Sequence, residues 1–323
     1  MPRKVMNFDL RHPARFSTTG AEVYAAALDM AAWADEHGFE RVSVPEHHQN
    51  EDGYLSCPLL VVAAFGARTR RITVRTGVIL APLYHPLRLA EEVAVADLCT
   101  QGRLELGLGL GNVPDDFVAF GVDRTRRGQL MEELIPMLRT AWTGEPFEYQ
   151  GRTVRVTPRP VRDPLPIYLG GGSRRAADRA ARLADGFHTA TPEYWEYYRE
   201  ACVAHGKGDP GPRVPRGPMF LWVTKDDPQR VREQLQPHFD HQARSYQAQA
   251  DKSGMQSPGP WVPKPGERSP YEVVGPQEAI EMANRLGPDG ELIFHPLLAG
   301  ISPRMAWEML DVLEHDVLPH LDH

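Results

Sequence analysis

The chain has 323 residues, of which 41% are hydrophobic and 24% charged, a balance typical of a globular protein with a sizeable core. Its formal net charge of -7 argues against a nucleic-acid-binding protein, which would present a basic face. No apolar run approaches the roughly 20 residues that cross a bilayer, and the three widely spaced cysteines indicate neither a disulfide framework nor a zinc site, so we expect a cytoplasmic protein without a metal.

Short β-branched runs alternate with amphipathic stretches along the first third of the chain. Strands are expected at residues 5–10, 41–44, 72–80 and 104–108. Helices are expected between them, at residues 19–37, 58–69 and 85–100. Because the connections are short, this order predicts parallel strands joined by right-handed crossovers.

The alternation resumes after a Pro-rich interruption at about 144–166. Further strands are expected at residues 166–169, 186–188, 219–223 and 291–295, with helices at 173–184, 192–205, 227–250, 276–286 and 303–317. Eight strands fit a closed (β/α)8 TIM barrel better than an open doubly wound sheet, so residues 1–323 are expected to form a single α/β domain. A second insertion, at about 237–275, is rich in Pro and Gly and suits either a lid over a site or an unstructured surface segment.

A carboxylate and two imidazoles directly follow the strand at 41–44. They are Glu46, His47 and His48. Parallel sheets build their sites at the carboxyl ends of strands, and histidine ordinarily titrates near neutral pH. The alternative is that one histidine caps the strand end and the other is solvated; in extended backbone the two side chains would point apart.

Two strands run into glycine-rich turns. The first turn, GLGLGNVPDD, includes Gly109, and its glycines indicate either a tight backbone bend or the close approach of a flat ligand. It follows the fourth expected strand, whereas a dinucleotide-binding fingerprint follows the first strand. In the second, YLGGGSRRAADRAA, Ser173 stands where a helix N-cap belongs. The three preceding glycines, with Arg174 and Arg175 after them, favour a phosphate site over an ordinary capped helix.

Isolated polar groups stand near the other expected strand ends. They are Asp9, Thr76, Gly77, Asn112, His188 and His295. Taken singly, such a group is more often a hydrogen-bonded strand-end residue than a catalyst, and Asp9 could instead pair with a neighbouring cation.

These features, in this order, resemble the bacterial luciferase-like family of flavin-dependent monooxygenases. The resemblance is carried by ADEHGFERVSVPEHH (34–48), HPLRLAEEVAVADLCTQGRLELGLGLG (85–111), DDFVAFGVD (115–123) and PIYLGGGSRRAADRAARLADG (166–186). It implies an oxidoreductase that uses reduced FMN and O2, through a flavin 4a-hydroperoxide, to oxygenate a small organic substrate. It also implies a separate flavin reductase as partner and a homodimer.

The resemblance assigns roles to matching positions. His47 matches the family's catalytic histidine, which assists the flavin chemistry by proton transfer or hydrogen bonding. The cofactor-binding positions are Thr76, Gly77, Val78, Gly109, Gly171, Gly172 and Ser173. Of these, 76–78 match a bulge under the flavin ring, often with a non-proline cis peptide, and 171–173 match the phosphate turn. Glu46 and Asn112 are the expected substrate contacts.

The chain departs from the family pattern in one turn. Many relatives carry an arginine at position 110 and an aromatic residue at 112, where this chain has Leu110 and Asn112. One phosphate or substrate contact is therefore missing, and Arg174 or Arg175 would have to supply it. Two alternatives stay open: hydride transfer with a deazaflavin (coenzyme F420) in the same barrel, which the E-H-H spelling disfavours, and a non-catalytic flavin-binding protein.

Overall fold

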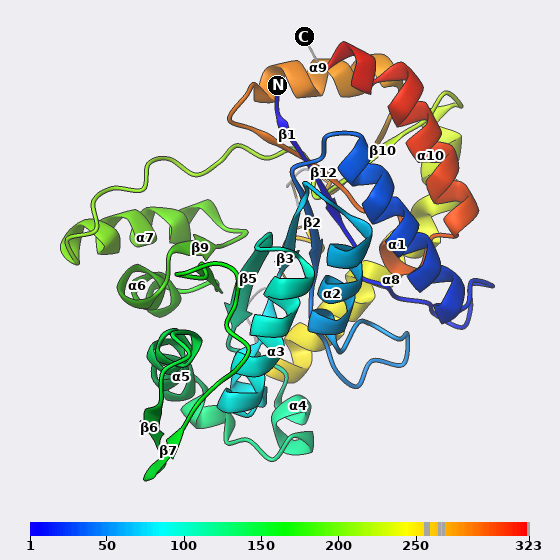
Figure 1. Cartoon of the computed structure of the whole chain (residues 1–323). Coiled ribbons are helices and arrows are strands. Elements are labelled where there is room, and N and C mark those ends of the chain that lie inside the picture. The colour runs from blue at the N-terminus through cyan, green and yellow to red at the C-terminus, as the bar shows by residue number, and fades with distance from the viewer. Residues whose placement is uncertain (255–258, 264–265, 267–268, 322–323) are drawn as a thin grey trace. The chain divides into compact units, whose positions relative to one another are not determined.

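The computed structural model describes residues 1–254, 259–263, 266 and 269–321 (Figure 1). The chain divides into two compact units, each built from helices and mainly parallel strands. The first unit comprises residues 1–43, 48–56 and 214–323, and the second comprises residues 44–47 and 57–213. In the part of the chain that the structure describes, no helix is both long enough and apolar enough for a bilayer crossing.

The strands of the first unit form two parallel groups. They are β1 (Arg3–Asn7), β2 (Arg41–Val44), β10 (Phe220–Val223), β11 (Tyr271–Val274) and β12 (Glu291–Phe294). β1 lies between β12 and β2, with Val5 opposite Ile293 on one side and Arg41 on the other. β10 pairs with β11. Every residue of β10 and β12 is buried, as expected for parallel strands covered on both faces.

Helices of the first unit begin and end at residues with recognisable signals. They are α1 (Gly20–Glu36), α8 (Pro228–Ser253), α9 (Pro276–Leu286) and α10 (Pro303–Asp316). At the start of α1, Thr19 accepts from the Glu22 N–H, and the Glu22 carboxylate accepts from the Thr19 N–H, forming a capping box. Gly38, at φ 67°, follows its end. Both boundaries agree with the sequence prediction.

The second unit has a parallel sheet in the order β3 (Thr73–Thr76), β5 (Leu104–Gly109), β8 (Ile167–Gly170) and β9 (Gly186–His188). A two-residue strand, β4 (Ile79–Leu80), also pairs with β5. Its helices are α2 (Pro58–Arg68), α3 (Pro86–Cys99), α4 (Pro114–Ala119), α5 (Arg127–Trp142), α6 (Arg174–Leu183) and α7 (Pro192–Ala204). In Figure 1, α6 and α7 lie side by side next to β9.

Three sequence predictions need correction. The strand expected at 72–80 is interrupted, because β3 and β4 are separated by two residues. The interruption at 144–166 contains an antiparallel hairpin, β6 (Phe147–Tyr149) with β7 (Arg152–Val154). The expected insertion at 237–275 is occupied at both ends by regular structure, since α8 continues to Ser253 and the unforeseen strand β11 begins at Tyr271; parts of the stretch between them lie outside the described residues.

Candidate active site

A buried carboxylate fixes the loop that follows β2. Glu46 is only 2% exposed, and its side chain accepts hydrogen bonds from the Leu80 backbone N–H (2.7 Å) and the Tyr84 hydroxyl (3.1 Å). Burial and the charge of Glu46 raise the pKa of the Tyr84 phenol, which therefore stays protonated as a donor. Glu46 thus ties the end of β2 to the segment that begins with β4.

His47 is the next residue and is half-buried. A backbone hydrogen bond from the Gly77 N–H to the Val44 carbonyl (2.7 Å) fastens the β3–β4 connection to the same end of β2. His47 therefore directly follows a short segment that is held in place at Val44 and at Glu46. A titratable ring on so firmly supported a loop is suited to proton transfer.

The connection between β3 and β4 is a bulge formed by Gly77 and Val78, and the peptide bond between them is cis, as the resemblance implies. Thr76 is fully buried, and its hydroxyl both donates to the Gly107 carbonyl (2.9 Å) and accepts from the Gly107 N–H (2.8 Å). Gly77 is exposed. The bulge therefore presents main chain at Gly77, while the Thr76 side chain is used inside the protein.

The glycines of β5 and β8 make room for this bulge. A Cβ on Gly107 would lie 2.1 Å from the Thr76 carbonyl oxygen, and a Cβ on Gly109 would lie 2.5 Å from Val78 Cγ2. A Cβ on Gly170 would lie 2.9 Å from Val78 Cγ1. Such separations are too short for real carbon atoms, so these positions require glycine. Of the two explanations for the GLGLG turn, the steric one has direct support.

The three glycines before α6 have different roles. Ser173 caps the helix, because its Oγ accepts from the Ala176 N–H (3.1 Å). A Cβ on Gly171 would lie 2.4 Å from Ala176 Cβ, whereas a Cβ on Gly172 would lie no closer than 3.7 Å to Tyr194. Packing therefore accounts for Gly170 and Gly171, so these two glycines are not evidence for a phosphate site. Gly172 and Ser173 are exposed at the helix N-terminus, where backbone N–H groups favour an anion.

Arginines that were not anticipated from the sequence lie near the turn after β5. Arg124 donates through Nε to the Asn112 carbonyl (3.1 Å), and Arg127 donates through Nη1 to the Arg124 carbonyl (2.7 Å). Burial, together with the charges of Arg124 and Arg179, lowers the pKa of Arg127. Positive charge is thus concentrated beside the turn that lacks an arginine at position 110. The run RTRR, directly after FGVD, was the available signal.

The two arginines expected to replace the missing contact differ in their surroundings. Arg174 donates to the Tyr197 hydroxyl and stacks on that ring, with its guanidinium carbon 3.9 Å from the ring centroid. Arg175 is exposed and makes no hydrogen bond or ion pair with any other described residue. Arg175 is therefore the better placed of the two to meet a ligand.

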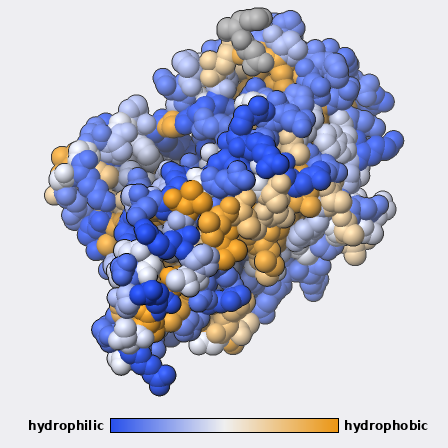
Figure 2. Space-filling model, viewed as in Figure 1, coloured by the Kyte–Doolittle hydropathy of each residue, from blue (hydrophilic) through white to orange (hydrophobic). Residues whose placement is uncertain are grey.

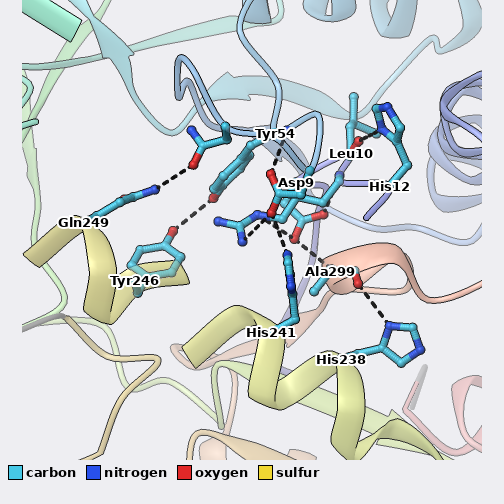
Figure 3. A network of polar contacts seen from close by, with 12 residues as sticks. Asp9, Leu10, His12, Tyr54, His238, His241, Tyr246, Gln249 and Ala299 are labelled. Carbon is cyan, nitrogen blue, oxygen red and sulfur yellow. Dashed lines mark hydrogen bonds and ion pairs between the residues drawn. The ribbon is translucent and has the colours of Figure 1, made fainter. Parts of the chain in front are cut away.

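A second polar cluster, centred on Asp52, lies in the first unit. Figure 3 shows this cluster, with Asp9, Tyr54 and His241 among the labelled residues. The Asp52 carboxylate accepts from Arg11 Nη1 (3.1 Å) and from His241 Nε2 (2.7 Å), and Arg11 is completely buried. Burial opposes ionisation of Asp52, but the hydrogen bond from His241 and the charge of Arg11 outweigh it and lower the pKa of this carboxyl. Asp9 Oδ2 lies 3.9 Å from Arg11 Nε, which confirms the pairing of Asp9 with a neighbouring cation.

Two tyrosines complete this Asp52 cluster. The Arg11 guanidinium lies over the Tyr54 ring, 3.8 Å from its centroid, and the Tyr54 and Tyr246 hydroxyls are 3.0 Å apart. Burial raises the pKa of both phenols, so both remain neutral. In Figure 3, Tyr246 and His241 both project from α8 toward the cluster, which joins that helix to the loops after β1 and β2. Across the described residues, no group of three or more His, Cys, Asp or Glu side chains is arranged to hold a metal.

Comparison with known proteins identifies the family. The model for luciferase-like monooxygenases matches residues 5–282, which is most of the chain. The chain belongs to the luciferase-like monooxygenase family. The resemblance drawn from the sequence motifs is confirmed.

Named relatives of this luciferase-like chain include an F420-dependent dehydrogenase and a monooxygenase. It is 34% identical to the F420-dependent glucose-6-phosphate dehydrogenase of Nakamurella multipartita over 187 residues, 54% of this chain and 55% of that protein. It is 36% identical to the 4-hydroxyprotoasukamycin monooxygenase of Streptomyces nodosus subsp. asukaensis over 118 residues, 36% of this chain and 32% of that protein. The matched stretches thus span about half, or less, of each relative.

Solved structures share the fold along nearly the whole luciferase-like chain. Monooxygenase RslO1 from Streptomyces bottropensis superposes with a TM-score of 0.78 at 23% identity, over 98% of this chain and 99% of that chain. The oxygenating constituent of 3,6-diketocamphane monooxygenase from Pseudomonas putida, solved with FMN, gives a TM-score of 0.75 at 17% identity, over 99% of both chains. These likenesses establish the fold.

Half of the ten site residues expected for a luciferase-like protein lie at or beside the bulge in the second unit. Contacts join Glu46, Thr76, Gly77, Val78 and Gly109 to it. The turn at 171–173 follows Gly170, which touches Val78, and Asn112 lies against Arg124. His47 continues the loop that Glu46 anchors.

Proposed function

We propose that this luciferase-like chain is a flavin-dependent monooxygenase that uses reduced FMN and O2 to oxygenate a small organic substrate. The observation that carries the proposal is the exposed main chain of Gly77. The Gly77 N–H donates a hydrogen bond to the carbonyl of Val44, and Val44 lies three residues before His47 in the sequence. A glycine main chain without a side chain, on a segment fastened close to an imidazole in the sequence, allows a flat redox ring to approach closely. The likeness in fold to an FMN-bound oxygenase supports the choice of cofactor. We further propose that both units form one closed (β/α)8 barrel in a cytoplasmic protein.

The residues near the bulge fit a phosphate-tailed cofactor. Gly172 and Ser173 would hold the phosphate at the exposed N-terminus of α6, assisted by the cations Arg124 and Arg175. Gly77 would lie under the ring. Thr76 and Gly109 would contribute through the shape of the bulge, because their contacts with Gly107 and Val78 are internal.

Reduced FMN, when bound, would supply the electrons that activate O2 for transfer of one oxygen atom to the substrate. His47 would give or take a proton at its ring nitrogen during that transfer. Glu46 is buried and already accepts two hydrogen bonds, so we assign it the positioning of the His47 loop in place of the expected substrate contact. The half-buried Asn112 keeps its proposed role as a substrate contact.

Hydride transfer with coenzyme F420 is the second candidate. It is favoured by the 34% identity to an F420-dependent glucose-6-phosphate dehydrogenase. The exposed Gly77 backbone would support a deazaflavin ring as well as a flavin ring, so the geometry of the bulge does not separate the two. Cofactor affinity and the response to oxygen distinguish the two functions.

Anaerobic titration of the full chain with reduced FMN, reduced F420 and reduced riboflavin tests the proposal. Reduced FMN is expected to bind at least about tenfold more tightly than riboflavin, because charge-assisted hydrogen bonds to the phosphate add roughly 1.5–3 kcal/mol. Mixing the FMN complex with O2 should then yield oxygenated product from a substrate panel. Tighter binding of F420 would favour hydride transfer, a bound flavin that is inert to O2 would indicate a binding protein, and no binding would refute the proposal.

Two neighbouring arginine variants sharpen this titration. Arg175→Gln should weaken FMN binding about tenfold, because it removes a positive charge that would pair with the FMN phosphate. Riboflavin has no phosphate, so its binding should not change. Arg174→Gln is the matched control, since Arg174 is engaged by Tyr197. Equal effects of both substitutions on FMN would contradict the assignment of Arg175.

We also propose that a separate reductase delivers the reduced flavin, as the likeness in fold to the oxygenating constituent of another monooxygenase suggests. The chain is further proposed to form a homodimer through α2 and α3. Large apolar side chains are exposed there: Leu60 (73%), Val95 (45%) and Leu98 (41%). Figure 2 shows an apolar area on this face, in the region that α2 and α3 occupy in Figure 1. Such patches commonly mark interfaces.

Leu60→Glu is therefore expected to convert a dimer into a monomer, because a carboxylate would be buried without a partner. Sedimentation equilibrium at micromolar concentration measures the change in mass. Val203→Glu is the matched control, since Val203 is a similarly exposed apolar residue (58%) on α7. A wild-type chain that sediments as a monomer would disprove the interface.

A further inference from the structure

A polar pair stands at the carboxyl ends of two adjacent strands in the first unit. β1 ends at Asn7, and His295 directly follows β12; the two strands are parallel neighbours, with Met6 opposite Phe294. The Asn7 amide nitrogen and His295 Nε2 are 3.0 Å apart, a hydrogen-bonding distance. The pair therefore lies at the edge where parallel α/β proteins bind their ligands.

Each member of this pair has a polar atom left over. His295 is only 8% exposed, and burial lowers the pKa of its ring to about 3, so the imidazole is neutral at physiological pH. With the Asn7 amide donating to Nε2, the ring proton is on Nδ1. Among the described residues, neither His295 Nδ1 nor the Asn7 amide oxygen has a hydrogen-bond partner. Neither atom belongs to the fully buried polar atoms that lack a partner in the described part of the chain, so a donor and an acceptor are accessible to a ligand.

Aromatic rings adjoin this pair. The Trp261 ring packs edge-on against the His295 ring, with centroids 5.1 Å apart and planes at 87°. The Tyr246 ring lies next along the row, 6.3 Å from Trp261. These rings supply apolar surface for an aromatic or otherwise flat molecule.

The charges nearby disfavour an anionic ligand. His295 and Asn7 are both uncharged, and burying an unpaired anion beside them would be costly. Arg11 lies beyond Tyr246, with its guanidinium carbon 5.8 Å from that ring. The Arg11 guanidinium already forms ion pairs with Asp52 (3.1 Å) and Asp9 (3.9 Å). A carbonyl or hydroxyl group, by contrast, needs only the donor and acceptor that the pair offers.

We infer that Asn7 and His295 recognise a carbonyl or hydroxyl group of an uncharged aromatic substrate. The His295 Nδ1–H donates to a substrate carbonyl, and the Asn7 amide oxygen accepts from a substrate hydroxyl. The inference rests on the proposed function only in calling this ligand the substrate. It separates the chain from its sugar-phosphate-oxidising relative, whose substrate is anionic.

Binding of three matched probes to the full chain, without flavin, tests the inference. Acetophenone, benzoate and phenyl phosphate carry the same ring but differ in charge, and ligand-observed NMR measures their Kd values. Acetophenone is expected to bind at least about tenfold more tightly than either anion, and His295→Phe should weaken it about tenfold, the effect of one lost hydrogen bond. His295→Gln keeps an N–H donor and should recover most of the affinity.

Several results would overturn the inference. These are tighter binding of benzoate or phenyl phosphate, unchanged acetophenone affinity in His295→Phe, and no measurable binding of any probe to the wild-type chain. Circular dichroism melting shows whether the His295→Phe variant folds. If it does not fold, the Asn7→Ala variant is tested with a hydroxylated probe, 4-hydroxyacetophenone. We expect Asn7→Ala to weaken binding of this probe about tenfold, and unchanged affinity would overturn the inference. Since the assay contains neither flavin nor oxygen, it can fail while the cofactor titration succeeds, and the reverse also holds.

Discussion

Replacing His47 with alanine is expected to lower the yield of oxygenated product per reduced FMN by about 10²–10⁴-fold, the usual contribution of a positioned proton-transfer group. The affinity for reduced FMN should be retained, because the proposed ring and phosphate contacts come from Gly77, Gly172 and Ser173. Oxygen that is no longer transferred should appear as hydrogen peroxide. Single-turnover mixing of the anaerobic FMN complex with O2 and substrate measures both products.

His48→Ala is the control for this experiment. It removes the same ring from the next position of the same loop, but without the adjacent anchor that Glu46 gives His47. We expect its product yield to stay close to that of the wild type. If His47→Ala also retained full yield, His47 would have no part in the mechanism, whichever cofactor binds.

The second large effect concerns stability. Asp52→Asn is expected to lower the free energy of unfolding by up to about 3–5 kcal/mol, because the buried Arg11 guanidinium loses its nearest carboxylate and keeps only the more distant Asp9, 3.9 Å away. The substitution also weakens the bond to His241 (2.7 Å), which links α8 to the loop containing residue 52. Urea denaturation at pH 7 measures the change.

Two further variants show whether charge is the cause. Arg11→Met in the Asp52→Asn background should recover part of the lost stability, because it removes the buried cation that has lost its nearest carboxylate. Glu308→Gln breaks an ion pair with Arg304 in which both side chains are exposed, and it should change little. A loss for Asp52→Asn no larger than that for Glu308→Gln would contradict the role assigned to the buried pair.

The lowered pKa of Asp52 also gives a direction for the pH dependence. The stability that its ionised form supplies is present above the unfolded pKa, about 3.9, and is lost as the pH falls through the lower folded value. The wild-type chain should therefore lose this stability on acidification below about pH 4. Asp52→Asn should lack that component of the acid dependence.

Much of the fold could be predicted because its signals are local. The capping box at Thr19, the proline at the start of α2 and the β-branched run of β2 are read within a few residues. The break between β3 and β4 could not be predicted from periodicity, because it depends on glycines in β5 and β8 that accommodate Val78. The helix predicted at 227–250 ends within three residues of the observed end of α8 at Ser253, whereas the four-residue strand β11 was missed because it is short and follows a Pro- and Gly-rich stretch.

The candidate site follows the same division. The loop with His47 was visible because its polar residues directly follow a strand. The Asp52 cluster was not, because Arg11 meets an acid 41 positions away and that acid meets a histidine 189 positions away. Arg124 was overlooked because only the fold brings it to the Asn112 carbonyl.

The interlock between Val78 and the glycines of two strands limits how this protein can diversify. A methyl group at 107 would collide with main chain, and one at 109 or 170 would collide with Val78, so single replacements there are blocked. Mutagenesis that aims at a new substrate specificity must therefore keep Val78 and these three glycines, or change several of them together. Leu110 and Asn112, which follow β5 and are half-buried, lie outside this interlock.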